Sequence, residues 1–488
     1  MEKLLSRLKD IEKALQVRLN AERDYKAHLR GMLSIIRMFP PEVLSNIFLM
    51  CSPDPPNEIT KYSSALLNRS IPWSISRVCR KWRYVCLTTP RLWVDIPTIL
   101  YDYQYGFFEL LRIATKLSFP HDIELRIWHT NAKGIEQLEE ILPRVHSLDV
   151  RVDLPMIKGL VQMKESFKRL KSATIHFTLN CSDEPPTLDF LTPVTSLNVS
   201  CSNPLAGWER NPYMFLRSVY FHWPNLTTFH GEQLPATFLH RILFAAPLLQ
   251  EVTMHNPKDT TSFDSSTASL APTSKVCHAD LKYLSLNCGR KSSLPDDILK
   301  HLHLPGLKNL HVEHAPQSFL SFLRETHGSL VELSLGEPLG TLDDRREMYT
   351  LCPALKTFTL DYAVPEDIGI LVVSPQSKLC PTLRHLTLHN FVLPDADSAR
   401  VFEDICSSRG LVPFSTPNSP EGLFQLDRIT AYMDDPDTVC LFRQRCLLGD
   451  NDNLVLPWFL LLDPVRLSFS ITILVRILTN LLSDIPFL

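Results

Sequence analysis

The most regular feature of the chain is an L-x-x-L-x-L pattern of apolar positions that returns at a nearly constant spacing. Clear copies begin at Leu281, Leu307, Leu330, Leu355 and Leu383, so that successive copies are 26, 23, 25 and 28 residues apart. Within each copy the apolar positions alternate with polar ones, which predicts a short strand with one buried face. A single unit cannot bury its own apolar side. The pattern therefore predicts a stack of units that share one continuous core.

Less regular copies lie on the N-terminal side of these, and one weak copy follows them. The apolar positions are Val145, Leu148, Val150; Leu170, Ala173, Ile175; Val194, Leu197, Val199; Leu249, Val252, Met254; Leu281, Leu284, Leu286; Leu307, Leu310, Val312; Leu330, Leu333, Leu335; Leu355, Phe358, Leu360; and Leu383, Leu386, Leu388, with weaker copies from Leu226 and Leu426. This segment resembles leucine-rich repeats, whose period is about 20 to 29 residues. The usual asparagine position is mostly absent and two steps stretch to 32 residues, so the repeats are irregular. We expect an α/β solenoid, an irregular leucine-rich-repeat horseshoe, over 143–453, with outer helices such as 296–302 and 319–325.

The polar positions of each predicted strand should form the face opposite the core. Solenoids commonly bind a protein on this concave face, so we expect it to recruit a target. The residues expected to bind the target are His230, His255, Tyr283, His311, Glu313, His385 and His389. The alternative, for any one of them, is a side chain that is merely solvated.

A helical pattern occupies residues 38–97. Pro40 and Pro41 can open a helix because the first helical position needs no N–H donor, and Glu42 then lies where the helix dipole favours a carboxylate. Apolar residues at helical spacing predict two helices, one with Val43, Leu44, Ile47 and Phe48 and one with Ile75, Val78, Cys79, Trp82, Val85 and Cys86. Pro90 should end the second helix. A helical domain of about 55 residues is marginal by itself, so a partner surface is expected.

The order of these residues resembles the F-box, specifically its fungal F-box-like variety. The resemblance rests on Pro40-Pro41-Glu42-Val43, Ile47-Phe48, Val78-Cys79-Arg80-x-Trp82-Arg83 and Pro90-x-Leu92-Trp93. It implies a three-helix module that docks on the Skp-type linker of SCF ubiquitin ligases, and through it on cullin. The residues implied in linker binding are Pro40, Pro41, Val43, Leu44, Ile47, Phe48, Val78, Cys79, Trp82, Leu92 and Trp93. Phe39 replaces the usual leucine, and an insertion at 52–70 lengthens the first connection. The alternative is a helical subdomain that packs only on its own chain.

Residues 1–37 show the pattern of one amphipathic helix. Its apolar positions follow alternating steps of four and three and are interrupted by Arg18 and Glu22; they are Leu4, Leu8, Ile11, Leu15, Tyr25, Leu29, Met32 and Ile36. This spacing favours a coiled coil, either in a homodimer or with another chain. The alternative is a helix folded back on the rest of the chain.

The remaining segments connect or end these parts. Residues 98–142 should link the helical module to the array and cap it, with a first strand at 123–127 and a helix at 134–142. The Ser/Thr-rich segment 257–278 is expected to be a mobile loop. The apolar residues 454–488 favour a buried capping helix over a membrane anchor, because Asp463, Arg466 and Arg476 leave no uninterrupted run of the roughly 20 apolar residues that a span needs.

Composition narrows the class of protein. The 488 residues are 44% hydrophobic and 21% charged, which is ample for a sizeable core, and the formal net charge of −3 gives no bulk electrostatic reason to expect nucleic-acid or membrane-surface binding. The twelve cysteines contain no C-x-x-C pair, and the first ten residues are charged rather than those of a secretory signal. We therefore expect a reduced intracellular protein, cytoplasmic or nuclear, with no membrane partner.

Catalytic motifs are missing from the sequence. It contains no nucleophile elbow, phosphate loop, paired zinc spacing or dinucleotide fingerprint. One histidine group could converge on a metal, but no cysteine or carboxylate completes a recognised spacing; its members are His301, His303, His311 and His314. We expect no catalytic residue, no metal and no cofactor.

Three classes of function follow. The first is a substrate-recognition adaptor of an SCF-type cullin-RING E3 ubiquitin ligase, in which the array binds a protein destined for ubiquitin-dependent degradation. The second is a non-catalytic leucine-rich-repeat scaffold that assembles proteins without ubiquitylation. The third, a hydrolase or metal enzyme within the array, would need a bound metal or a deep polar pocket.

Overall fold

The computed structural model describes most of the chain in segments. The described residues are 9, 12–13, 15–26, 38–51, 71–99, 107–128, 136–152, 154–178, 188–202, 222–234, 236–257, 275–288, 298–326, 328–372, 379–390, 401, 404–405, 408–409, 428–432, 460–463 and 466–472. They belong to two compact units, Met1–Val150 and Arg151–Leu488. The insertion 52–70, most of 257–278 and most of 454–488 lie outside the described residues.

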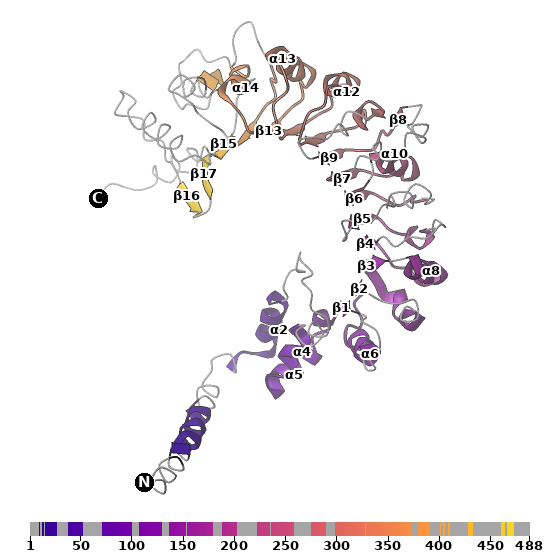
Figure 1. Cartoon of the computed structure of the whole chain (residues 1–488), viewed down its shortest axis with the longest axis vertical. Helices are drawn as coiled ribbons and strands as arrows, with labels where there is room; N and C mark the ends of the chain where they lie inside the picture. Colours follow the sequence, from indigo (N-terminus) through magenta and orange to yellow (C-terminus); the bar gives the residue numbers. More distant parts are fainter. Residues whose placement is uncertain are drawn as a thin grey trace, which may run out of the picture. The chain divides into compact units, whose positions relative to one another are not determined.

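The first unit contains the predicted helical module. Its elements are α2 (Pro41–Met50), α4 (Ile71–Ser76), α5 (Arg80–Leu87) and the 3-10 helix η2 (Pro90–Trp93) (Figure 1). Helix α2 begins at Pro41 as predicted, with Glu42 in its first turn. The second predicted helix is in fact two helices, because the chain is extended at Cys79, whose thiol accepts a hydrogen bond from the Trp82 amide and caps α5. Pro90 opens a short helix, whereas it was expected to end one.

Three parallel strands follow the helical module. They are β1 (Asp95–Ile99), β2 (Ile123–Trp128) and β3 (Val145–Val152), with helix α6 (Phe107–Leu117) between the first two. The strand predicted at 123–127 is confirmed, but β1 precedes it and is joined to it by an ion pair of Arg126 with Asp95 at 2.9 Å. The helix predicted at 134–142 is wrong. The described residues there form only two 3-10 turns, η3 (Glu136–Leu138) and η4 (Leu142–Arg144).

The second unit is built on a large parallel sheet whose strands follow one another in chain order. The strands are β4 (Ser172–Thr178), β5 (Ser196–Ser202), β6 (Thr228–Glu232), β7 (Glu251–His255), β9 (Tyr283–Asn287), β11 (Asn309–Val312), β12 (Glu332–Leu335), β13 (Thr357–Asp361), β14 (His385–His389) and β15 (Arg428–Tyr432). The register is constant, so that equivalent repeat positions lie side by side, as Leu310, Leu284 and Leu333 do. The protein is therefore mixed α/β with a large parallel sheet.

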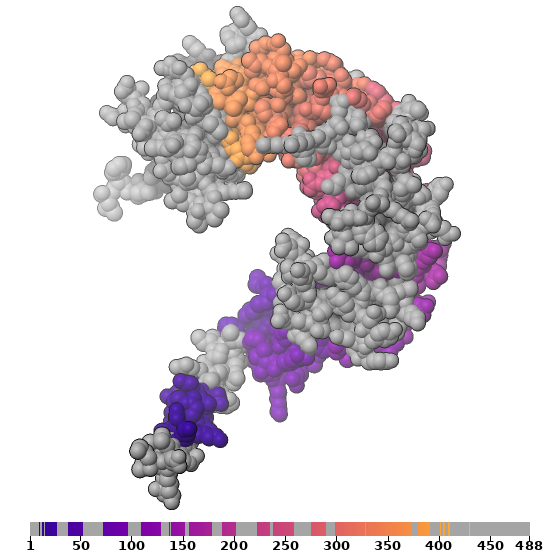
Figure 2. Space-filling model, viewed as in Figure 1, coloured from indigo at the N-terminus to yellow at the C-terminus, as the bar shows by residue number. Residues whose placement is uncertain are grey.

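The core lies on one face of this sheet. Every apolar repeat position predicted within the described strands is buried, for example Leu284, Leu310 and Leu333. The return segments contain α8 (Leu154–Gln162), the turns η5 (Lys164–Ser166) and η6 (Asp189–Leu191), α10 (Ala236–Ala245), α12 (Phe319–Glu325), α13 (Leu342–Leu351) and α14 (Pro365–Gly369). Figure 1 shows α10, α12 and α13 on the same side of the sheet. Figure 2 shows the segment from β11 to β14, in orange, as a continuous body of packed side chains.

Two return segments differ from their prediction. The helix predicted at 319–325 is confirmed as α12, but the one predicted at 296–302 ends early, because Leu302–His303 forms strand β10. Its partner is β8 (Val276–Cys277), which lies in the segment expected to be a loop. Both ends of that segment are anchored: Pro257 and His278 are buried, and His278 Nε2 lies 3.1 Å from the Ala246 carbonyl oxygen.

The apolar C-terminal segment is also corrected. Its described residues form strands β16 (Leu460–Asp463) and β17 (Arg466–Thr472), and β17 pairs in antiparallel fashion with β16 on one side and with β15 on the other. No helix occurs in these two described stretches. The reason is visible in β17, where apolar residues at 467, 469 and 471 alternate with Ser468, Ser470 and Thr472.

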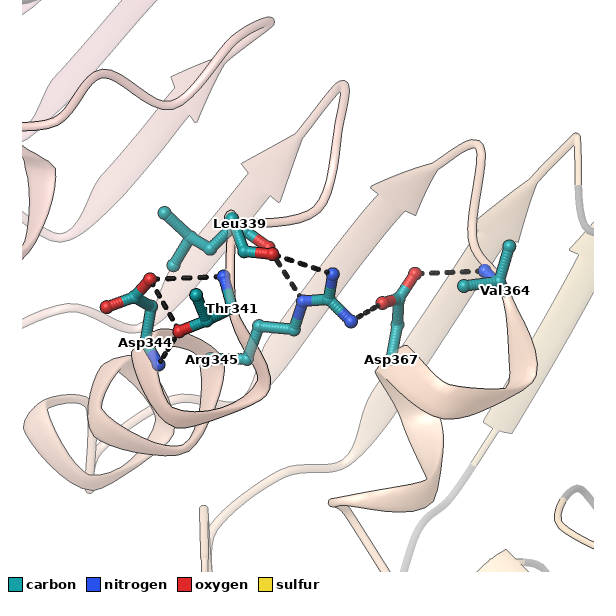
Figure 3. Close-up of polar contacts among 7 residues, drawn as sticks. Leu339, Thr341, Asp344, Arg345, Val364 and Asp367 are labelled. Atoms are coloured by element: carbon teal, nitrogen blue, oxygen red, sulfur yellow. Dashed lines mark hydrogen bonds and ion pairs between the residues drawn. The ribbon is translucent and has the colours of Figure 1, made fainter.

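A polar network joins the return segments after β12 and β13 (Figure 3). Thr341 and Asp344 form a reciprocal cap at the start of α13. Arg345 donates through Nε to the Leu339 carbonyl oxygen at 2.7 Å and forms an ion pair with Asp367 of α14. The other oxygen of Asp367 accepts the Val364 amide at 2.9 Å. Because Asp367 is 1% exposed, this network ties two neighbouring repeats of the second unit together through a buried charge.

Candidate functional site

The helical module has a complete core of its own. Helix α2 contributes Leu44 and Phe48, which lie one turn apart and are 0% and 2% exposed. Trp93 of η2 is buried, donates through Nε1 to the Cys86 carbonyl oxygen at 2.9 Å, and meets Trp73 edge to face at 4.9 Å. The remaining buried apolar residues are Ile75, Val85, Cys86 and Leu92.

A second apolar stripe on α2 stays on the surface. Val43, Ile47 and Met50 follow one another at i, i+4 and i+7, which places them along one side of the helix. Val43 is 41% exposed, Ile47 is half-buried and Met50 is 86% exposed. We call these three residues the α2 stripe. An exposed row of apolar side chains that does not belong to the module core is a candidate protein-binding surface.

The structure divides the eleven predicted linker-binding residues into two groups. Leu44, Phe48, Leu92 and Trp93 are buried in the module core. The others keep exposed or half-buried surface: Pro40, Pro41, Val43, Ile47, Val78, Cys79 and Trp82. Trp82 packs on Phe48 with ring centroids 5.0 Å apart.

Sequence inspection missed several exposed apolar residues of the module. Met50 is one helical turn beyond Ile47, so the spacing from Val43 already contained the signal that could have found it. Tyr84 and Leu87 of α5 are 62% and 43% exposed. They give α5 an apolar surface of its own.

The second candidate surface is the polar face of the sheet in the second unit. On strands β4 to β14 it is formed by the residues that alternate with the buried repeat positions, and we call it the polar strand face. Its middle row contains no charged residue from β4 to β14; the row is Thr174, Asn198, His230, Thr253, Ser285, His311, Ser334, Thr359 and Thr387. Carboxylates such as Glu332 stand in the flanking rows, and lysines such as Lys308 precede the strands. The face therefore offers hydrogen bonds bordered by charges of both signs.

Within this face, His230, His255 and Asn287 form a contact cluster on β6, β7 and β9. The rings of His230 and His255 are 4.8 Å apart, and Asn287 Nδ2 lies 2.7 Å from His255 Nδ1. Burial lowers the pKa of His230, and the neighbouring His255 lowers it further. Burial also lowers the pKa of His311 on β11. A lowered pKa favours the neutral form of these two imidazoles, which can both donate and accept a hydrogen bond.

The other predicted target-binding residues lie on the same face, some next to the cluster on β6, β7 and β9 and some several strands away from it. Tyr283 is opposite Glu251 and Asn309 in neighbouring strands, and Glu313 directly follows β11. His385 and His389 belong to β14, three strands beyond β11, so the structure does not bring them to the β6–β9 cluster. His385 is exposed, whereas the other six predicted residues are half-buried.

The four histidines considered as a metal site do not converge. His314 pairs with Glu337 at 3.0 Å, and the His301 ring faces that of His240 at 6.0 Å. In the described part of the chain, no group of three or more histidine, cysteine or acidic side chains is arranged to hold a metal ion.

None of the helices among the described residues combines the length and apolar character that a membrane crossing needs. Comparison with known protein families finds no family that matches the chain. A search of curated protein sequences likewise finds no match.

Proposed function

We propose that this protein is a substrate-recognition adaptor of an SCF-type cullin-RING E3 ubiquitin ligase. The helical module is an F-box-like domain that docks on the Skp-type linker, and the array is an irregular leucine-rich-repeat solenoid that holds a protein target. The observation that carries the proposal is the α2 stripe, an exposed apolar row on a module whose core is already complete. It agrees with the order of F-box-like residues from Pro40 to Trp93 in the sequence.

The solenoid part of the proposal is supported by the sheet of the second unit. Its strands follow chain order with constant register, and the repeated apolar positions are buried next to one another. Stacking of this kind leaves a long polar face free for a target. The contribution of the adaptor to ubiquitin transfer is proximity, since it holds the target near the charged conjugating enzyme and needs no acid or base of its own.

Co-purification from cells tests the docking step. Val43→Glu with Met50→Glu places two charges on the α2 stripe without touching the module core, and it should lower recovery of the linker at least about tenfold. Ile113→Glu on α6 is the matched control, because Ile113 is 42% exposed against 41% for Val43. Undiminished recovery of the linker with the double variant would contradict the proposal. Recovery of the linker without cullin would favour the scaffold instead.

Proximity labelling with and without proteasome inhibition tests the recognition step. Neighbours that accumulate when the proteasome is inhibited should be lost when His385 and Glu332, both exposed on the polar strand face, are replaced by alanine. Phe244→Ala on α10 is the control, since Phe244 is 87% exposed on a return helix. Equal loss with the control variant would exclude the polar strand face as the target-binding surface.

A further inference from the structure

The N-terminal helix has exposed apolar side chains at coiled-coil spacing. The described residues between 9 and 26 are helical and all of them are exposed (Figure 2, indigo). Leu15 is 62% exposed and Tyr25 is 63% exposed, although both occupy the apolar seam of the heptad pattern.

The two charged seam positions determine which partner fits. In the heptad spacing Leu15 and Glu22 are a positions, and Arg18 and Tyr25 are d positions. A parallel, in-register pair of such helices would place each residue against its own copy, so Arg18 would meet Arg18 and Glu22 would meet Glu22. Like charges inside a seam repel each other. A parallel homodimer is therefore disfavoured at its centre.

An antiparallel pair centred on Asn20 removes this conflict. In that arrangement a positions face d positions, so Arg18 meets the partner's Glu22. The two-fold symmetry forms the same ion pair a second time, between Glu22 and the partner's Arg18. Leu15 then meets the partner's Tyr25. A shift by one heptad in either direction would place both charges against apolar residues, so the charge pair selects one register. Buried polar pairs are well suited to such selection.

The charged residues that flank the seam also pair with opposite charges in this register. Glu12 and Lys26 occupy e positions, and the antiparallel pairing places Glu12 beside the partner's Lys26. Leu19, which is 44% exposed, falls beside its own copy near the symmetry axis. On either side of the described stretch, the sequence continues the same apolar spacing at Leu4, Leu8, Ile11, Leu29, Met32 and Ile36.

We propose that the N-terminal helix binds a second copy of this chain as an antiparallel coiled coil centred on Asn20, with Arg18 paired to the partner's Glu22. The dimer carries two helical modules and two polar strand faces. The inference does not depend on the proposed ligase function, because it rests only on the charges and spacing of this helix.

Solution mass measured by light scattering on the full chain tests the dimer. The wild-type protein should have twice the chain mass of 55.8 kDa. Arg18→Glu should raise the dimer dissociation constant at least about tenfold, since both central pairs become repulsive. Arg23→Glu, the same charge change outside the seam, should leave the dimer intact. A monomeric wild-type chain, or equal effects of the two variants, would overturn the proposal.

Disulfide cross-linking tests the orientation. Chains with Leu15→Cys mixed with chains carrying Tyr25→Cys should form a mixed disulfide, identified in digested peptides by mass spectrometry so that native cysteines do not interfere. Leu15→Cys alone should not cross-link, because in the antiparallel dimer the two copies of residue 15 are about 15 Å apart along the axis, beyond disulfide reach. Efficient cross-linking of Leu15→Cys to itself would overturn the antiparallel arrangement.

Discussion

The buried ion pair between Arg345 and Asp367 gives the sharpest test of how neighbouring repeats are held together. Replacement of Arg345 by alanine removes the ion pair of the Asp367 carboxylate, which is 1% exposed, and leaves it with the Val364 amide in the network of Figure 3. Breaking a buried pair in this way costs about 3 to 5 kcal/mol. We expect the lower end of this range, because Asp367 can escape part of the penalty by taking up a proton.

The matched control is the next residue. Arg346 is 60% exposed and pairs with Asp343, which is 93% exposed, so Arg346→Ala should cost about 0 to 1 kcal/mol. Amide hydrogen exchange should be followed in peptides from α13, β13 and α14, with β6 and β7 as an internal reference. A loss of about 3 kcal/mol corresponds to roughly a hundredfold fall in protection. Equal protection in the two variants would refute the reasoning.

The pH dependence of the same variant adds a second check. Burial raises the pKa of Asp367, and Arg345 opposes that rise, so removing Arg345 should raise the pKa further. Protonation then neutralises the orphaned carboxyl as the pH falls, and the penalty of Arg345→Ala should shrink towards acid. Arg345→Met combined with Asp367→Leu removes both charges and should restore most of the protection.

Three further predictions concern single residues. Gly336→Ala should cost about 1 to 3 kcal/mol and lower the thermal midpoint, because a Cβ would lie 2.9 Å from the Glu313 Cα, whereas Gly340→Ala, with 3.6 Å to its nearest neighbour, should not. Cys352, whose pKa burial raises to about 12, should resist alkylation at pH 8 in the native protein while the exposed Cys277 reacts; equal rates would contradict its burial. Burial lowers the pKa of His311 in the folded protein. The contribution of neutral His311 to stability is therefore complete above about pH 6.5 and is lost as the pH falls through the folded pKa. The thermal midpoint of His311→Gln should fall less towards acid than that of the wild type.

The strands from β3 to β15 in the large sheet could be predicted because each one carries the same short signal. Apolar and polar residues alternate with a period of two, and the copies return at a steady spacing, so even the weak copy at Leu226 coincides with strand β6. The return segments carry no shared signal. Their lengths and compositions differ, and for that reason the strand at Leu302–His303 and helix α6 were not predicted.

The contact surface of the helical module could be located only in part. Leu44 and Phe48 share the i, i+4 spacing of Val43 and Ile47, so the sequence could not show which pair faces the core. The structure resolves the choice, since η2 and α5 pack against the side of α2 that holds Leu44 and Phe48. At the C-terminal end, bulk hydrophobicity favoured a helix, whereas the alternation within β17 carried the correct signal.

The central claim is that the α2 stripe docks a Skp-type linker, and titration of the purified full chain with purified linker tests it most directly. Isothermal titration calorimetry should give a dissociation constant of about 1 μM or tighter for the wild type, corresponding to roughly −8 kcal/mol. Val43→Glu with Met50→Glu should weaken binding at least about tenfold, and Ile113→Glu should leave it unchanged. Absence of binding by the wild type, or equal affinity of the wild type and the stripe variant, would contradict the account.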